Sequence, residues 1–239
     1  MTLPHTSLVR RRNTHRLIPS RHRDGGDSVL VRIAADDAHL RDLFELDGAT
    51  NDRLLAENER LCDIGVRELV FGVPSYRVIN ATFTHPHPLG SRFNSSHRGA
   101  WYAAFELQTA QAEVAFHKSV QLAEVGRFED DVTLDDYLAD FSSEFHDLRD
   151  AVAFGACLAP DSYVASQGLA EQLLAAGSLG IVYPSVRRSG GTCVACFRPA
   201  LVCHVRRAKT YRFLWEGTPA PSISTTEALP SLPRAPPTS

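Results

Sequence analysis

Two short apolar runs on either side of a glycine-rich turn constrain the fold more than any other feature. Residues 179–183 read Leu-Gly-Ile-Val-Tyr and residues 192–197 read Thr-Cys-Val-Ala-Cys-Phe, and the turn between them contains Arg-Arg-Ser-Gly-Gly. Runs of this length, rich in β-branched residues and separated by turn residues, predict an antiparallel strand pair. The fold is therefore expected to contain a β-sheet.

Other elements follow from periodicity. Strands are predicted at residues 28–33 and 101–105, and extended chain with a break at Pro74 at residues 70–83. Helical spacing predicts two helices within residues 40–61, one from the capping residue Thr109 to about Glu124, and one from Ser166 to a C-terminal glycine at Gly177. Strands interleaved with helices in this way indicate an α+β fold.

The two ends of the chain differ from the middle. Residues 1–23 hold six arginines and no acidic residue, so we predict a flexible basic arm over residues 1–27 whose removal leaves the chemistry intact. Residues 217–239 are rich in Pro, Ser and Thr and are predicted to be a disordered tail. Between them we expect a helical extension (28–69) packed on a catalytic domain (70–216).

The composition excludes several classes of protein. Of 239 residues, 44% are hydrophobic and 22% charged, and the formal net charge is −3, which is typical of a globular protein without an overall polyanion-binding character. Five cysteines form an odd set that favours reduced thiols. Neither a signal peptide nor an apolar run of about 18 residues is visible. We therefore expect a cytoplasmic protein with no membrane segment.

Four polar residues in the middle of the chain could together handle a dinucleotide. Taken singly, each is explained as well by a structural role, for example a surface charge or a turn residue. Together they supply what cleavage of the bond between nicotinamide and ribose requires. An arginine binds pyrophosphate through its planar fork, a tyrosine ring stacks on nicotinamide, a carboxylate stabilises an oxocarbenium-like centre, and a serine hydroxyl bonds a phosphate or ribose oxygen. These residues are Arg92, Tyr102, Glu113 and Ser185.

The motifs around these residues resemble the RES domain, a family named for its Arg, Glu and Ser. The resemblance extends over roughly residues 70–205 and rests on Tyr76-Arg77, Gly90-Ser-Arg-Phe-Asn94, Trp101-Tyr102, Ala112-Glu113-Val114, Gly180-Ile-Val-Tyr-Pro-Ser185 and Gly190-Gly191. One motif departs from the family, which often has Gly-Gly-Arg-Trp-Asn where this chain has Gly-Ser-Arg-Phe-Asn. The arginine is unchanged.

The resemblance implies a fold, an activity and a partner. RES proteins resemble ADP-ribosyltransferases, which implies a split β-sheet with flanking helices. They are toxins of toxin–antitoxin pairs, usually encoded beside an Xre-type antitoxin, and they degrade NAD⁺ by phosphorolysis or hydrolysis. NAD⁺ would thus be a substrate, with inorganic phosphate as a candidate co-substrate and no cofactor or metal. The alternative enzyme within this resemblance transfers ADP-ribose to a protein side chain.

The resemblance also implies roles for single residues. Glu113, Arg92 and Tyr102 correspond to catalytic residues, and Arg77, Arg92, Tyr102 and Ser185 correspond to residues that contact NAD⁺. Glu113 would be the catalytic carboxylate and Tyr102 the ring that stacks on nicotinamide. Arg77 and Arg92 would be the cations that contact the dinucleotide.

Two other interpretations are weaker. Cys193, Cys196, Cys203 and His204 suggest zinc, but residues three apart in a strand face opposite sides, so buried thiols are favoured. His85, His87 and His97 could bind a metal, but no carboxylate or cysteine accompanies them, so a loop near the ligand is expected instead. His117 is interpreted as a packed helix histidine. A nucleic-acid-associated regulator acting through the basic arm is the alternative of another class, and six arginines without aromatic residues do not favour it.

Overall fold

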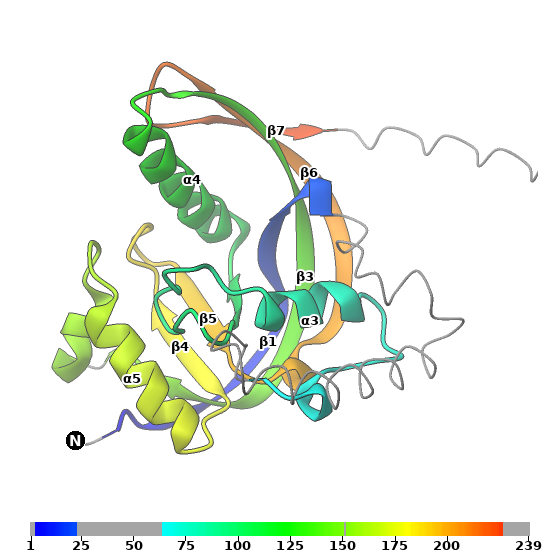
Figure 1. The fold of residues 1–239 in the computed structure, drawn as a ribbon, viewed down its shortest axis with the longest axis vertical. Coiled ribbons are helices and arrows are strands. Elements are labelled where there is room, and N and C mark those ends of the chain that lie inside the picture. The colour runs from blue at the N-terminus through cyan, green and yellow to red at the C-terminus, as the bar shows by residue number, and fades with distance from the viewer. Residues whose placement is uncertain (1–2, 23–63, 151, 227–239) are drawn as a thin grey trace, which may run out of the picture.

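The computed structural model describes residues 3–22, 64–150 and 152–226 (Figure 1). Its elements in chain order are β1 (Thr6–Pro19), η1 (Ser20–His22), η2 (Val66–Glu68), α3 (Tyr76–Thr84), β2 (Trp101–Ala104), α4 (Leu107–Glu124), β3 (Glu129–Asp147), η3 (Val152–Leu158), α5 (Val164–Ala175), β4 (Gly180–Pro184), β5 (Thr192–Cys196), η4 (Pro199–Leu201), β6 (Cys203–Glu216) and β7 (Ser222–Thr226). None of the helices within these residues combines the length and apolarity that crossing a bilayer requires.

The strands form one sheet with two parts. In the first, the long strands β1, β3 and β6 and the short β7 pair antiparallel, with β3 between β1 and β6. In the second, β5 pairs antiparallel with both β2 and β4. The parts meet where β4 runs parallel to β3 at His146 and Asp147, and where β1 touches β2 at the single pair His15–Ala104. The α+β class and the split sheet predicted from the sequence are confirmed.

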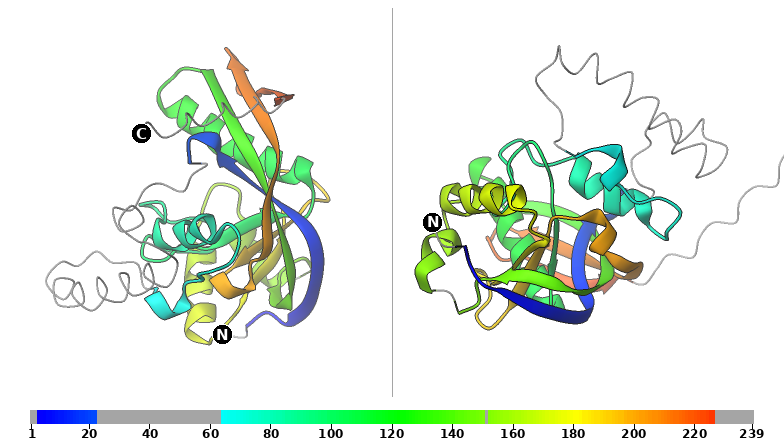
Figure 2. Two further views of the ribbon diagram at one scale, coloured as in Figure 1. Left: turned by 90° about the vertical axis from the view of Figure 1, so that its right-hand side faces the viewer. Right: turned by 90° about the horizontal axis from the view of Figure 1, so that it is seen from below.

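Helices cover both faces of the shorter part, as the views in Figures 1 and 2 show. Helices α4 and α5 pack on one face, where their apolar residues meet Cys193 and Ala195 of β5. Helix α3 packs on the other face against Val194 and Cys196. Alternate residues of β5 therefore enter two separate cores, which explains why the strand is almost uniformly apolar.

The prediction of a flexible basic arm is wrong, because Thr6–Pro19 is the strand β1. It pairs with β3 from Thr6↔His146 to Pro19↔Leu134, interrupted by a bulge between Arg11 and Thr14. Val9, Thr14 and Leu17 are buried, whereas the consecutive arginines 10–12 are exposed. Three adjacent arginines hide the alternation of a strand, and the backbone pairing with β3 is not visible in the local sequence.

Extended chain at residues 70–83 is also a wrong prediction, because Tyr76–Thr84 forms helix α3. Its β-branched residues favour a strand by intrinsic propensity. Ile79 and Phe83, however, lie four residues apart and are 1% and 0% exposed in the core. Burial of this helical face outweighs the propensity, which varies by only about 1 kcal/mol between residues.

Several other predictions hold with small shifts. Strand β2 and the pair β4–β5 lie where the sequence predicts them. Helix α4 begins at Leu107, two residues before Thr109, and α5 begins at Val164, two residues before Ser166. Gly177 ends α5 as predicted, with a φ of 80° and its N–H bonded to the carbonyl of Leu174 at 3.0 Å.

The tail and the N-terminal extension are described only in part. Ser222–Thr226 forms strand β7 on the edge of β6, so the prediction of a disordered tail from residue 217 is wrong for this segment. The predicted strand at 28–33 and the helices within 40–61 lie outside the described residues, as does the end of the tail from 227 on. The longest strand, β3, corresponds to no element predicted from the sequence.

Candidate active site

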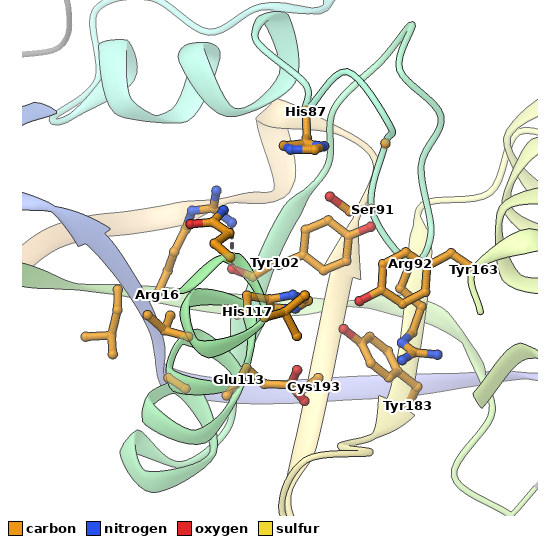
Figure 3. Close-up of a pocket in the computed structure, with 18 of the residues that line it drawn as sticks. Arg16, His87, Ser91, Arg92, Tyr102, Glu113, His117, Tyr163, Tyr183 and Cys193 are labelled. Atoms are coloured by element: carbon orange, nitrogen blue, oxygen red, sulfur yellow. Dashed lines mark hydrogen bonds between the residues drawn. The ribbon is translucent and has the colours of Figure 1, made fainter. Parts of the chain in front are cut away.

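A cavity of about 560 Å³ opens between helix α4, strands β1, β2 and β5, and the turn before β2. Figure 3 shows Arg16 on one side, Arg92, Tyr163 and Tyr183 on the other, and His117 and Glu113 between them. The described residues that carry polar side chains into its wall are His15, Arg16, His87, Ser91, Arg92, Tyr102, Glu113, His117, Gln121, Glu124, Tyr163, Tyr183 and Cys193. Three of the four polar residues singled out in the sequence thus share one cavity.

A tight turn positions Arg92. Gly90 has a φ of 69°, and a Cβ there would lie 2.3 Å from the carbonyl oxygen of Asn94, so only glycine fits. Ser91 pairs with Asn94 across the turn. The side-chain amide of Gln167 on α5 donates to the carbonyls of Leu89 and Ser91, both at 3.0 Å. The turn is therefore fixed to α5 before any ligand binds.

Arg92 is 6% exposed and is held by the C-terminal end of η3 and the residue that follows it. Its Nη1 donates to the carbonyl oxygens of Cys157 at 3.1 Å and Ala159 at 2.8 Å, and its guanidinium lies 4.8 Å from the centre of the Tyr163 ring. No described residue bonds to Nε or Nη2. That edge of the guanidinium is the fork that binds two oxygens of a phosphate at once.

Tyr102 on β2 uses its hydroxyl within the protein. The oxygen accepts the N–H of Phe93 at 2.8 Å and the hydroxyl donates to Asn94 Oδ1 at 2.8 Å. Burial raises the pKa of Tyr102 above its usual range, so the phenol stays neutral. Its hydroxyl fastens the arginine-bearing turn to β2, and its ring lines the cavity.

Glu113 on α4 and Ser185 after β4 form one unit. The Ser185 hydroxyl donates to Glu113 Oε1 at 2.6 Å, while its oxygen accepts the N–H groups of Arg187 and Arg188, each at 3.1 Å. Cys193 contributes a weak S–H contact to the same carboxylate oxygen at 3.8 Å. Ser185 is absent from the described residues that line the cavity, so its hydroxyl holds the carboxylate in place.

The loop after β4 is joined to the start of α4. The N–H of Ser185 bonds to the carbonyl of Gly191 at 2.9 Å, and Arg188 donates to Thr109 Oγ1 at 3.1 Å. A Cβ on Gly191 would meet Thr109 Oγ1 at 2.5 Å. Glycine at this position therefore lets the loop approach the helix closely enough for Ser185 to reach Glu113.

The chain was compared with known proteins. The family model described as the RES domain matches residues 69–216, which is more than half of the chain. This chain belongs to the RES-domain family. No curated protein matches it. A solved structure that matches is the Mycobacterium tuberculosis MbcT–MbcA toxin–antitoxin complex, with 15% identity, a TM-score of 0.40, and 55% of this chain and 73% of that chain covered.

Arg77, like Ser185, is a predicted NAD⁺-contacting residue of this RES domain that does not line the described cavity. Arg77 is exposed on α3, where its Nε bonds to the hydroxyl of Tyr76 at 3.3 Å. Helix α3 buries Ile79 and Phe83, which leaves Arg77 on the solvent side and away from the described cavity wall. The predicted contact of Arg77 with NAD⁺ is therefore not supported by its position.

Arg16 is a candidate site residue that the sequence reasoning missed. It projects from β1 into the cavity, where its Nη1 donates to the carbonyl of Tyr102 at 2.9 Å and its guanidinium lies 5.0 Å from the Trp101 ring centre. Its Nε is buried with no hydrogen-bond partner among the described residues. Burial lowers the pKa of Arg16 to about 10, which leaves it positively charged at neutral pH. The cavity thus has a second cation opposite Arg92, and it comes from β1, outside the residues that match the RES domain.

Three further residues, His15, His87 and Cys193, complete the wall. His15 bonds through Nδ1 to Oδ2 of Asp136, a residue that is 2% exposed, at 2.9 Å. His87 lines the cavity, as its loop position predicts. Burial and the neighbouring Glu113 raise the pKa of Cys193, so it is a neutral thiol. Within residues 3–22, 64–150 and 152–226, no group of three or more His, Cys, Asp or Glu side chains is arranged to hold a metal ion.

Proposed function

We propose that this RES-domain protein cleaves NAD⁺ at the bond between nicotinamide and ribose. The observation that carries the proposal is the Glu113 carboxylate, which lines a cavity with an arginine on either side and is oriented by the Ser185 hydroxyl at 2.6 Å. A carboxylate held in this way suits a reaction whose transition state places positive charge on a sugar carbon. Family membership supports the same activity.

The two arginines suit the pyrophosphate of the dinucleotide. Arg92 presents its Nε–Nη2 edge, and Arg16 on the opposite wall has a buried Nε with no described partner. Both guanidinium groups belong to residues of the cavity wall, so their positive charges favour an anionic ligand there. Two cations match the two negative charges of a pyrophosphate.

The rings suit the nicotinamide end. Tyr102, Tyr163 and Tyr183 line the wall beside Arg92 (Figure 3), and the first and last of these have pKa values raised by burial. Neutral rings in a partly enclosed site offer flat surfaces for an aromatic leaving group. As the bond between C1 of the ribose and the pyridinium nitrogen breaks, its electron pair neutralises the nicotinamide. Glu113 stabilises the ribosyl cation that remains.

We further propose that the protein acts as a toxin and is neutralised by a partner antitoxin of the Xre type. Loss of NAD⁺ halts growth, so an enzyme with this activity needs a means of restraint. Expression in bacteria should deplete NAD⁺ before growth stops. The alternative of ADP-ribose transfer to a protein would instead leave a mass-shifted protein.

The decisive experiment incubates the purified full chain with NAD⁺ and identifies products by mass. The wild type should release nicotinamide, and Glu113→Gln should reduce the rate about 10²–10³-fold, because an amide keeps the shape of the carboxylate but not its charge. Glu171→Gln on the exposed side of α5 is the matched control and should keep the wild-type rate. Near wild-type turnover by Glu113→Gln would exclude Glu113 as the catalytic carboxylate.

A further inference from the structure

His117 is a cavity residue that the proposed roles leave unused. It follows Glu113 by four residues on α4, a spacing that brings two side chains to the same helix face with Cβ atoms about 5–6 Å apart. Both line the cavity, and Figure 3 shows His117 between Arg16 and the tyrosine side of the wall. The position differs from the packed helix histidine expected from the sequence.

The surroundings of His117 keep its ring neutral. Burial lowers its pKa below the usual value, and the attraction of Glu113 only partly opposes this. The charged groups that face it from other elements are Arg187 on the loop after β4, Arg92 on the turn before β2, and His87 after α3, and all three lower the pKa further. No hydrogen bond to another described residue occupies its ring nitrogens. A neutral imidazole therefore faces the cavity with a nitrogen free to accept a proton.

The number of arginines and lysines in the cavity wall distinguishes between phosphate and water as the acceptor of the ADP-ribosyl group. Among the described residues of its wall, Arg16 and Arg92 are the arginines, and lysine is absent. Both are assigned to the pyrophosphate of NAD⁺. Inorganic phosphate, with close to two further negative charges, would enter beside Glu113. Arg187, which faces His117, already donates to the carbonyl of Pro160 and lies over the Phe116 ring. Water needs no such cation and needs only a base within reach.

We propose that His117 is the general base that activates water, so that this RES domain hydrolyses NAD⁺. The inference rests on the proposed function. The oxygen of water bonds to C1 of the ribose as the bond from C1 to nicotinamide breaks, and the electron pair leaves with nicotinamide. The proton of the water passes to His117 and then to solvent. The balanced reaction gives ADP-ribose, nicotinamide and one proton from NAD⁺ and water.

The test replaces His117 and supplies azide, a nucleophile that does not need a general base. His117→Ala should lower nicotinamide release about 10²-fold, within the usual range for a general base. Azide is an anion with no proton to lose, so it should restore the rate of this variant at least about tenfold and yield ADP-ribosyl azide. Azide should not restore the rate of Glu113→Gln, because that variant lacks the carboxylate that stabilises the ribosyl cation. If His117→Ala folds poorly, His117→Gln takes its place in the test, because it keeps a polar side chain but supplies no base. It should show the same loss of rate and the same recovery with azide.

The pH profile supplies a readout that a packing role would not change. The wild-type rate at saturating NAD⁺ should fall as pH drops through the lowered pKa of His117, and His117→Gln should lose that limb. His146→Gln is the matched control, because His146 likewise has a lowered pKa but bonds to Ser178 at 2.9 Å outside the cavity. Its profile should match the wild type.

Separate results overturn the inference and the proposed function. A His117→Ala variant with nearly the wild-type rate, or a slow variant that azide fails to restore, would overturn the role of His117. ADP-ribose-1″-phosphate as the main wild-type product in millimolar phosphate would overturn the assignment of water. No nicotinamide release by the wild type would overturn the proposed function, and this inference with it.

Discussion

Replacing Ser185 with alanine separates the positioning of a carboxylate from the binding of substrate. The change removes the hydrogen bond at 2.6 Å to Glu113 and leaves two N–H groups, of Arg187 and Arg188, without their acceptor. A hydrogen bond to a charged group contributes about 1.5–3 kcal/mol. If that amount is lost from the transition state, the maximal rate falls about 10–10²-fold, since about 1.4 kcal/mol is a factor of ten. The KM for NAD⁺ should change little.

The assay is the initial rate of nicotinamide release over a range of NAD⁺ concentrations, together with the thermal unfolding midpoint. Ser178→Ala is the control, because Ser178 is a buried serine that bonds to His146 away from the cavity. It should lose stability to a similar degree and keep its maximal rate. A Ser185→Ala enzyme with an unchanged maximal rate and a raised KM would refute the positioning role, and would favour the direct contact with NAD⁺ predicted from the sequence.

Three further predictions concern other parts of the protein. Arg92→Lys should raise the KM for NAD⁺ about tenfold, because an ammonium group cannot form two parallel bonds; an unchanged KM would remove Arg92 from the site. Deleting residues 1–19 should give an insoluble or inactive protein, since β1 pairs along β3 and carries Arg16, and a soluble, active product would contradict this. Burial alone would raise the pKa of Asp147, but hydrogen bonds from Arg149 and Ser7 hold it well below its usual range. Its contribution to stability is therefore complete above about pH 4 and declines as the solution is acidified further. The thermal unfolding midpoint of Asp147→Asn should thus fall less steeply below pH 4 than that of the wild type. Equal slopes in the two proteins would contradict a lowered pKa for Asp147.

Local sequence predicts the elements whose apolar residues share one face. The strands β4 and β5 and the helices α4 and α5 fall in this class, and so does Gly177, which a helix end requires. Helix α3 was missed because its two core residues lie among β-branched ones. Strand β1 was missed because it is held by backbone pairing with a strand about 130 residues away, which no local pattern records.

The residues of the candidate site likewise include some that local sequence predicts and some that it does not. Arg92, Tyr102 and Glu113 come from neighbouring elements in the chain, and their residue types were enough to group them. Arg16 lies in a segment that charge alone assigns to solvent, so only the pairing of β1 shows that it is buried. Arg77 carries the right charge for a dinucleotide but lies on the wrong side of α3. Ser185 was predicted to contact NAD⁺, and in the structure its hydroxyl instead bonds to the Glu113 carboxylate.

The pairing of β1 with β3 also governs when the enzyme can become active during synthesis. His15 and Arg16 leave the ribosome early, but the strand that receives them ends at Asp147, and the loop that orients Glu113 is made later still. Contacts between residues so far apart form slowly. A nascent chain or a proteolytic fragment that lacks either β1 or the loop after β4 has no complete cavity. For a protein proposed to destroy NAD⁺ in the cell that makes it, such an arrangement delays activity until most of the chain has been made.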